Sequence, residues 1–208
     1  MASEGTIWQL WNLMERIVAG AVLTLMGPAL LISAIAIIVM SRRSPFVAHQ
    51  RVGQGGRLIW VLKLRTMWDG HSQGRFKLVH RLSQSEAPLL PPAQKNARVT
   101  SRFAAFCRRF SVDELPQLWQ VIQGEMSLIG PRPLTRQELT AYYGGAAASV
   151  MSSRPGISGL WQVSGRSRLT YPQRRRLDVF LVRKRSFPLY FKILWLTIPR
   201  VLSGKDAW

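Results

Sequence analysis

The longest feature of the hydrophobic pattern is an uninterrupted apolar run near the start of the chain. Residues 17–40 contain no charged side chain. At about 1.5 Å of rise per residue, this run would form a helix of roughly 36 Å, longer than the ~30 Å hydrocarbon core of a bilayer. The run is too long for a cleaved signal peptide, and no small-x-small cleavage site precedes Arg42, so we predict a helix that enters a membrane.

Two features of this run bear on how the helix enters. Arg42 and Arg43 follow it at once, and the positive-inside rule then keeps the downstream chain on the cytoplasmic face. Gly27-Pro28 lies at its middle, where a proline removes a backbone hydrogen bond and bends or breaks the helix. The pattern leaves open a kinked spanning helix and a helix that breaks at Pro28 and returns to the same face.

Short extended segments follow the apolar run. Residues 46–52 and 58–62 are separated by the glycine-rich segment 53–56, and the second is rich in strand formers; this pattern predicts two strands around a turn. Residues 69–97 are polar and contain prolines at 88, 91 and 92. We therefore expect a long loop there.

Apolar spacings of three and four residues predict helices in the second half of the chain. One is expected near Phe103, one after Ser111 that ends at Gly124, and a basic one over residues 171–186. The apolar side chains expected on their packed faces are Leu115, Leu118, Trp119 and Ile122 for the second helix, and Leu177, Phe180 and Leu181 for the third.

The tail of the chain, residues 187–202, is apolar and aromatic, and its only charges are Lys192 and Arg200. Trp and Tyr are favoured at membrane–water boundaries, so this segment suits a helix that lies in the interface. A core helix of the globular domain would show a similar composition, and both interpretations stay open.

The balance of charge adds information that the hydrophobic pattern does not contain. The 208 residues include 29 Lys and Arg against 10 Asp and Glu, a net charge of +19. Such an excess predicts a polyanionic partner: nucleic acid, an anionic membrane surface or a phosphate-rich substrate. The single cysteine, Cys107, excludes an intrachain disulfide and a zinc site built on thiolates. The chain contains neither GxxxxGK[ST] nor GxGxxG, so the usual ATP and NAD cradles are unsupported.

Asp113 and Glu114 are the only adjacent acids in the chain. Ser111 and Glu114 fit a capping box that starts a helix. Because Arg108 and Arg109 stand just ahead, the same helix end would also form an anion site and hold an aspartate ionised, ready to attack. The segment is therefore either an ordinary helix start or a reactive acid pair that binds phosphate.

Arginines flanked by proline and glycine are the second candidate feature. In the GPRP segment at 130–133, two prolines leave Arg132 little conformational freedom to lose, and its planar fork suits bidentate contact with phosphate. The RPG segment at 154–156 repeats the arrangement, and Arg166 follows a glycine. Together with the acid pair, these arginines indicate a diphosphate site.

A divalent cation would complete such a site. Magnesium typically takes one or two carboxylates together with phosphate oxygens, and it neutralises charge that develops during phosphoryl transfer. Asp113 or Glu114 could supply that contact.

Several segments, in order along the chain, resemble those of the bacterial sugar transferases, the monotopic phosphoglycosyl transferases. The string SVDELPQLWQVIQGEMSLIGPRP at 111–133 is similar to the signature of that family. QRVG at 50–53, KLRTM at 63–67, RPGISGLWQVSGR at 154–166 and LDVFLV at 177–182 fit as well. The resemblance covers nearly the whole chain from the membrane segment onward.

The resemblance implies a fold feature and a mechanism. The family's re-entrant membrane helix breaks at a proline, which here would be Pro28. Its catalytic pair falls on Asp113 and Glu114: the aspartate attacks the phosphate of a UDP-sugar, forms a phosphosugar–enzyme intermediate and releases UMP, and the glutamate accepts a proton. Polyprenol phosphate then takes the phosphosugar. The reaction requires Mg²⁺, which we assign to Asp113.

The resemblance also implies which cations bind the substrate. The family's phosphate-binding arginines fall on Arg108 and Arg132. The further substrate-binding residues that we predict, from the other matching segments, are Lys63, Arg65, Arg154 and Arg166.

Three positions depart from the family pattern. A Lys-Arg pair and an aspartate usually precede the membrane helix, but here these positions hold Trp11, Asn12 and Glu15, so we expect a different interfacial anchor. The usual Asp-Pro-Arg is Asn96-Ala97-Arg98, which puts an acid role there in doubt, and Gly27-Pro28 lacks the usual serine hydroxyl. None of these changes affects the acid pair.

We therefore predict a mostly helical α/β domain on the cytoplasmic face of the bacterial inner membrane, with a re-entrant helix and interfacial amphipathic helices. Residues 1–43 would form the membrane segment and residues 44–208 the catalytic domain. The predicted reaction moves a sugar-1-phosphate from a UDP-sugar to undecaprenyl phosphate at the start of surface-glycan synthesis. The alternative is a membrane-anchored basic module that binds nucleic acid or anionic lipid. Such a module would need aromatics interleaved with a continuous basic stripe, so we expect no nucleic-acid partner.

Overall fold

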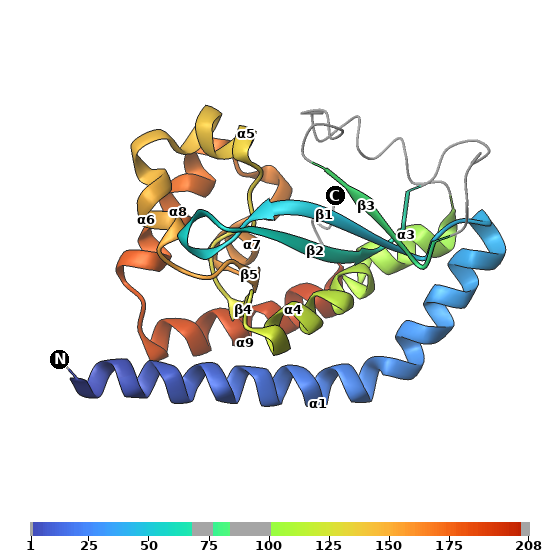
Figure 1. Cartoon of the computed structure of the whole chain (residues 1–208), viewed down its shortest axis with the longest axis horizontal. Coiled ribbons are helices and arrows are strands. Elements are labelled where there is room, and N and C mark those ends of the chain that lie inside the picture. The colour runs from blue at the N-terminus through green and yellow to red at the C-terminus, as the bar shows by residue number, and fades with distance from the viewer. Residues whose placement is uncertain (1, 68–76, 84–100, 205–208) are drawn as a thin grey trace.

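The computed structural model describes residues 2–67, 77–83 and 101–204 of the chain. The described part is mostly helical, with two small sheets and one long apolar helix at its N-terminal end (Figure 1). This confirms the predicted mixture of many helices and few strands. The predicted boundary between residues 43 and 44 falls in the turn that follows the long helix, and the division into two domains stays a prediction.

Helix α1 (Ala2–Ser41) contains the predicted apolar run and continues through Pro28. Figure 1 shows that it bends partway along its length, as expected where a proline cannot donate its backbone hydrogen bond. By length and composition alone, residues Ile7–Ser41 are able to cross a membrane. The bend fits both interpretations of the run that the sequence left open.

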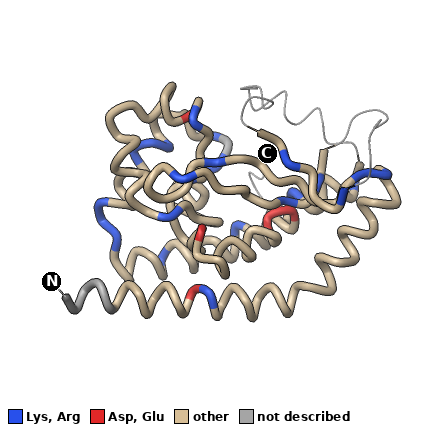
Figure 2. Tube along the Cα trace, in the orientation of Figure 1, with Lys and Arg blue, Asp and Glu red and all other residues tan. Residues whose placement is uncertain are grey.

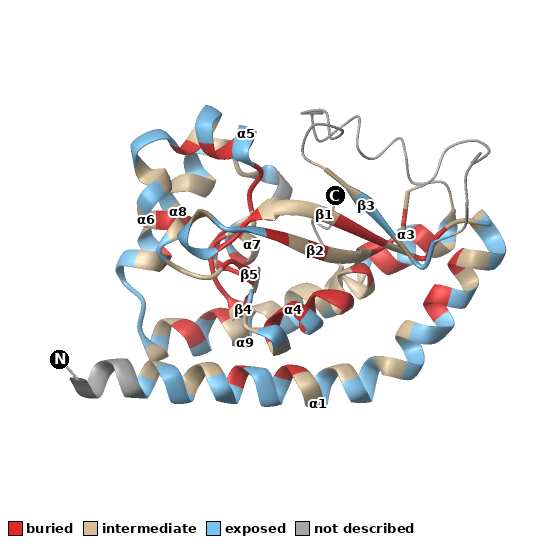
Figure 3. Ribbon diagram, in the orientation of Figure 1, coloured by how far each residue is buried: buried red, intermediate tan, exposed pale blue. Residues whose placement is uncertain are grey.

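One face of α1 packs on the rest of the protein. Glu15 and Ala19, and further along Ser33, Ala34 and Ile37, are buried, and their spacings place each group on one side of a helix. Most other apolar side chains of α1 are exposed, as the few buried segments of α1 in Figure 3 show. An apolar surface of this extent is typical of a helix that contacts lipid or another protein.

The first sheet has the strand order β2-β1-β3. Strands β1 (Phe46–Val52) and β2 (Leu58–Leu64) form an antiparallel hairpin around the turn η1 (Gln54–Gly56). This confirms the two predicted strands. Strand β3 (Val79–Leu82) pairs in parallel with β1, so the prediction of a loop over residues 69–97 was wrong at this point; the rest of that segment lies outside the described residues.

A helical layer lies between this sheet and α1 (Figure 1). It consists of α3 (Arg102–Arg109), the 3₁₀ helix η3 (Val112–Gln117) and α4 (Leu118–Gln123). A core cluster joins α1 through Ala19, β2 through Val61 and α4 through Val121. The predicted helices near Phe103 and after Ser111 are thus confirmed, although α4 leaves Trp119 48 % exposed instead of packing it.

The second sheet brings two of the motif segments together. Strands β4 (Ser127–Ile129) and β5 (Gly156–Ser158) pair in parallel. The backbone N–H of Gly156 donates to the carbonyl of Pro131 across 2.9 Å. A Cβ atom at Gly156 would lie 2.0 Å from the backbone nitrogen of Gly130, so only glycine permits this approach. The GPRP and RPG segments are therefore neighbours in the fold.

Short helical elements connect the two sheets to the C-terminal helices. They are α5 (Arg136–Glu138), the π-helical turn η4 (Leu139–Tyr143), η5 (Gly144–Ala146), α6 (Ala147–Met151), α7 (Leu160–Ser164) and η6 (Arg166–Arg168).

The predicted basic helix is α8 (Tyr171–Arg183), which a capping box at Thr170 starts. Its interior face differs from the prediction. Asp178 is fully buried beside Leu181, whereas Phe180 is about half exposed. The carboxylate takes an inward position because it has hydrogen-bond partners there, which a pattern of apolar residues alone does not reveal.

The tail forms α9 (Phe187–Ser203), which has a packed side and an exposed apolar side, so a place in the membrane interface stays a prediction. Tyr190 and Ile193 are buried in the core, whereas Trp195 is 74 % exposed on the other side. The ring of Trp11 in α1 contacts the rings of Phe187 and Tyr190 with centroids 4.9 and 4.8 Å apart. The first and last helices therefore lie side by side.

Candidate active site

The acid pair lies in η3, but the helix start there differs from the predicted one. Ser111 has a left-handed backbone (φ 56°) and its side chain makes no capping hydrogen bond. The backbone N–H of Glu114 donates instead to the Ser111 carbonyl across 3.0 Å. The predicted capping box was therefore wrong, because the chain leaves α3 in a tight left-handed turn. The prediction of an anion site required the N-terminus of a longer α-helix, whereas η3 is a 3₁₀ helix of six residues.

The side chain of Glu114 reaches across to the sheet. Lys63, on β2, places its Nζ 2.7 Å from Glu114 Oε1. This contact is a partly exposed ion pair. Burial raises the pKa of Glu114, but the charge and hydrogen bond of Lys63 outweigh it, helped by Arg132 and Arg166, and the pKa lies below its usual value. Glu114 is thus held as a carboxylate.

Asp113 faces inward and is only 6 % exposed. Burial raises the pKa of its carboxyl to about 6, with a further upward push from Glu114, while the charges of Lys63 and Arg108 oppose the rise. Burial disfavours the charged form, and the nearby cations restore part of the loss. At neutral pH the carboxyl is therefore mainly ionised and poorly hydrated, two properties that a carboxylate nucleophile requires.

Arg108 belongs to the same group of charges. It is the seventh residue of α3 and is 4 % exposed. Burial lowers its pKa to about 10, although Asp113 and Glu114 act in the opposite direction. The predicted phosphate-binding arginine therefore lies next to the acid pair.

The GPRP loop supplies the next cation. Arg132 lies with its guanidinium carbon 4.8 Å from the centre of the Trp161 ring, a stacking that fixes the plane of the fork. Its charge and that of Arg166, which has a left-handed backbone (φ 45°), both act on Glu114. The structure thus brings together Lys63, Arg108, Arg132 and Arg166 around Asp113 and Glu114.

A buried network behind Arg132 escaped sequence reasoning. The Tyr143 hydroxyl donates to Asp178 Oδ2 across 2.8 Å, and the Asp178 carboxyl also accepts from the backbone N–H of Arg132. Burial raises the pKa of Asp178 to about 7. The sequence did contain a signal for Asp178: it is one of only ten acids in the chain, and it lies among the apolar residues of the LDVFLV segment. Asp178 positions the loop that carries Arg132.

Two predicted cations occupy other places. Arg65 donates from Nε to the Ser44 carbonyl across 2.7 Å. Arg154 lines a separate cavity together with Arg16 and Arg185. The structure therefore does not place Arg65 or Arg154 with the acid pair, and their roles in substrate binding stay predictions. Figure 2 shows how few acidic positions the described chain offers among its many basic ones.

The buried Glu15 clarifies one departure noted in the sequence. Its Oε1 accepts hydrogen bonds from the Ser127 hydroxyl at 2.6 Å, the Leu128 N–H at 3.1 Å and the Tyr190 hydroxyl at 2.5 Å. Glu15 thereby ties α1 to β4 and α9. The segment 96–98, the site of another departure, lies outside the described residues.

Metal ligands other than the acid pair are scarce in the described part of the chain. Within residues 2–67, 77–83 and 101–204, no three His, Cys, Asp or Glu side chains come together to hold a metal ion. The adjacent carboxylates of Asp113 and Glu114 fit Mg²⁺ only if substrate phosphate oxygens and water complete its six oxygen ligands.

The chain is similar to known proteins over most of its length. The family model of the bacterial sugar transferases matches residues 8–204. A UDP-galactose-lipid carrier transferase of Erwinia amylovora is 37% identical over 192 residues, which cover 90% of this chain and 39% of that protein. The exopolysaccharide production protein ExoY of Rhizobium meliloti (strain 1021) is 34% identical over 196 residues, or 93% of this chain and 86% of ExoY.

A third relative carries the most explicit name. The UDP-glucose:undecaprenyl-phosphate glucose-1-phosphate transferase of Xanthomonas campestris pv. campestris is 33% identical over 198 residues, which cover 90% of this chain and 38% of that protein. This chain therefore spans about two fifths of the Erwinia and Xanthomonas proteins and most of ExoY.

Proposed function

The chain belongs to the bacterial sugar transferase family, and from this premise we propose that it transfers a sugar-1-phosphate from a UDP-sugar to undecaprenyl phosphate and releases UMP. The names of the Erwinia and Xanthomonas relatives support a UDP-hexose donor. The name of ExoY supports a place in exopolysaccharide production.

One observation carries the proposal: buried Asp113 and partly buried Glu114 are surrounded by four cations from four different elements. Lys63 comes from β2, Arg108 from α3, Arg132 from the loop after β4 and Arg166 from η6. Fixed cations of this kind bind a diphosphate and stabilise the charge that develops on it. A simple anion-binding protein has no need of an acid pair among these cations, because the acids repel the anion.

The proposed chemistry proceeds in two displacements at one phosphorus. An oxygen of the Asp113 carboxylate forms a bond to the sugar-bearing phosphorus, and the bond from that phosphorus to the bridging oxygen breaks, so that UMP leaves. A phosphate oxygen of the lipid then attacks the same phosphorus, and the bond to Asp113 breaks. The family assigns Glu114 as proton acceptor, and its lowered pKa and its pairing with Lys63 keep it in the deprotonated form that this role requires.

Mg²⁺ belongs to the proposal as a cofactor. Asp113 would hold the ion together with oxygens of the donor diphosphate. When bound, the ion would neutralise negative charge on the diphosphate.

The same proposal places the domain at the cytoplasmic face of the bacterial inner membrane. The bend partway along α1, a helix that contains Pro28, is compatible with a re-entrant helix, and Arg42 and Arg43 just after the helix support its return to that face. The exposed apolar side chains of α9, including Phe191 and Trp195, support a helix that lies in the interface.

Trapping of the covalent adduct tests the chemistry. Protein with Asp113→Asn is expected to lose UMP release roughly a thousandfold or more and to take up no label from a UDP-sugar labelled in its sugar-bearing phosphate. The matched control is Glu125→Gln, which removes an exposed acid. A panel of UDP-sugars would identify the donor. Full turnover by the Asn variant, with normal folding, would show that the covalent role is wrong.

Accessibility of single cysteines tests the membrane arrangement. In a Cys107→Ser background, cysteines introduced at exposed Gln9 and at Arg42 lie on either side of the bend. A re-entrant helix predicts that an impermeant maleimide labels neither from the periplasm of intact cells and both in inverted vesicles. Periplasmic labelling of the Gln9→Cys variant would instead support a spanning helix.

A further inference from the structure

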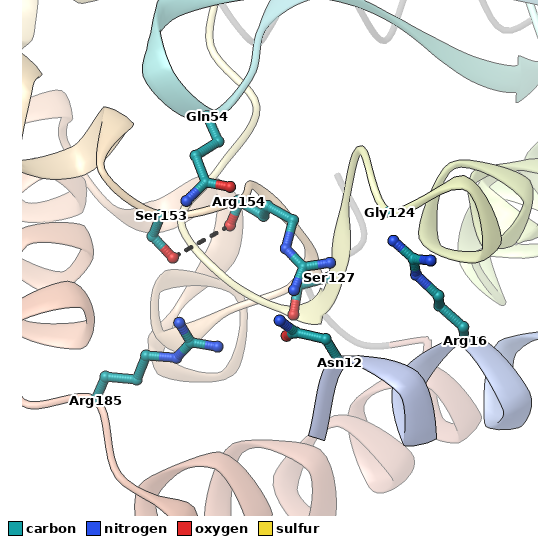
Figure 4. Close-up of a pocket in the computed structure, with 8 residues that line it drawn as sticks. All are labelled: Asn12, Arg16, Gln54, Gly124, Ser127, Ser153, Arg154 and Arg185. Atoms are coloured by element: carbon teal, nitrogen blue, oxygen red, sulfur yellow. Dashed lines mark hydrogen bonds between the residues drawn. The ribbon is translucent and has the colours of Figure 1, made fainter. Parts of the chain in front are cut away.

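A cavity of about 260 Å³ lies between α1, the loop before β5 and the turn that joins α8 to α9. Three arginines line it: Arg16 from α1, Arg154 from the loop and Arg185 from the turn. Asn12 and Ser127 lie beside them (Figure 4). Because a water molecule occupies about 30 Å³ in the liquid, the cavity has room for a tetrahedral oxyanion with several waters.

The cavity is distinct from the acid pair. Gly124, which lines it, ends α4, whereas Asp113 lies near the start of η3, so the two places flank opposite ends of the η3–α4 segment. The groups that act electrostatically on Arg154 are Glu15, Arg16 and Tyr190. The charges that act on Asp113 come from Lys63, Glu114 and Arg108.

The three arginines carry the same charge and line one cavity. Within the described part of the chain, no ion pair within 4.0 Å joins Arg16, Arg154 or Arg185 to an acid. Glu15 is the nearby acid, but its Oε1 is occupied by the Ser127, Leu128 and Tyr190 donors. Burial, with repulsion from a neighbouring arginine, lowers the pKa of Arg154 and of Arg185, although the charge of Glu15 opposes the shift. Cations held together in this way are stabilised when an anion enters.

Two local features present the guanidinium groups to the cavity. Arg185 stacks on the ring of Trp8 with its guanidinium carbon 3.9 Å from the ring centre, which leaves the N–H groups at the edge of the plane to donate. Arg16 passes close to Gly124, where a Cβ atom would lie 2.0 Å from one of its terminal nitrogens. Glycine at position 124 therefore gives Arg16 its place in the wall.

We propose that Arg16, Arg154 and Arg185 form a second phosphate-binding site, separate from the transfer site. Phosphate fits because three guanidinium forks offer several N–H donors to its oxygens. Two sources could supply it: the headgroup of an anionic phospholipid, since the apolar faces of α1 and α9 lie close by, or a free phosphate. The inference goes beyond the proposed transfer reaction and holds whether or not that reaction takes place.

Binding of two probes to the full chain in a phosphate-free detergent tests the site. The probes are inorganic phosphate and the short-chain lipid dihexanoylphosphatidic acid, each followed by calorimetry. We expect the wild type to bind at least one probe and Arg154→Gln/Arg185→Gln to bind it at least tenfold more weakly. The matched control is Arg183→Gln/Lys184→Gln, which removes the same charge from exposed positions beside the cavity and should stay within twofold of the wild type.

The outcomes decide both the site and its source. Tighter binding of the lipid than of inorganic phosphate, by tenfold or more, supports a headgroup; equal binding supports a free phosphate. If the double variant does not fold, as judged by circular dichroism, the single Arg16→Gln variant takes its place, with the same expected loss. The proposal is overturned if the wild type binds neither probe, or if the control weakens binding as much as the cavity variants do.

Discussion

Carboxylates and arginines meet in two regions of this protein, and the acids are used differently in each. Around η3, Glu114 pairs directly with Lys63 and Asp113 is surrounded by cations. Beside α1, Glu15 accepts hydrogen bonds from neutral groups, and the arginines line a cavity. The acids of the first region carry the proposed chemistry, whereas the acid of the second joins helices. Nearness of an acid to arginines thus does not define its role; the groups that its oxygens contact do.

Among changes that leave both acids in place, the largest expected effect comes from removing the cation that holds Glu114. Lys63→Met leaves a partly buried carboxylate unpaired, so the pKa of Glu114 rises and UMP release should fall by about a hundredfold. Stability should change little, because a partly exposed ion pair contributes about 1 kcal/mol or less. Lys77→Met, at an exposed position, is the control for loss of charge. If the variant instead loses stability but keeps a normal rate per folded molecule, the Lys63–Glu114 pair has a structural role, like Glu15 in the second region.

Acid pH should lower UMP release by protonating Asp113 in the first region. With the pKa of Asp113 raised to about 6, its ionised fraction, and with it UMP release, falls about tenfold for each pH unit below that value. The same raised pKa stabilises the folded state at low pH, and this contribution is lost as the pH rises from about 4 through 6. UMP release and melting temperature, followed together from pH 4 to 8, check both directions. A rate that is flat across pH 6 would contradict an ionised nucleophile.

The shape of the Arg132 side chain matters as well as its charge. Arg132→Lys keeps the charge but loses the planar fork and the stacking on Trp161, so kcat/KM should fall about fivefold to tenfold. Arg183→Lys, at an exposed position, should leave the rate unchanged. Equal rates for both variants would mean that the first region recognises its ligand by charge alone.

The smallest effect on the rate is expected in the second region. Tyr190→Phe removes one donor to Glu15 and should lower the free energy of unfolding by about 2 kcal/mol, as for a hydrogen bond to a charged group, with UMP release per folded molecule unchanged. Tyr142→Phe, whose hydroxyl makes no hydrogen bond to the described residues, is the control. A large loss of rate without a loss of stability would give Glu15 a role in the reaction.

Much of the fold follows from local signals in the sequence. The apolar run, the glycine turn before β2, Gly124 at the end of α4 and the aromatic tail each act through neighbouring residues, and each was predicted. Strand β3 was not, because it pairs with β1 across some thirty residues of sequence and has no strong pattern of its own.

The site shows the same division between local and distant causes. Motif spacing identified Asp113, Glu114, Arg108 and Arg132, and the structure brings them together. Motif spacing did not reveal that the backbone of Ser111 is left-handed, or that Asp178 accepts a hydrogen bond from the backbone N–H of Arg132. Both features depend on packing between elements that are far apart in the sequence. The separation of Arg154 from the acid pair has the same cause, because β4 and β5 are parallel and Arg132 follows β4 whereas Arg154 precedes β5.

The bonds of Glu15 also set an order of events during synthesis. Its partners Ser127 and Tyr190 follow it by 112 and 175 residues. A ribosome adds about 5–20 residues per second, so the carboxylate waits on the order of ten seconds or more for its last donor. Until α9 emerges, the first helix holds an acid for which the nascent protein has no complete set of partners. The full set of hydrogen bonds that joins Glu15 of α1 to β4 and α9 is therefore complete only after α9 has been synthesised.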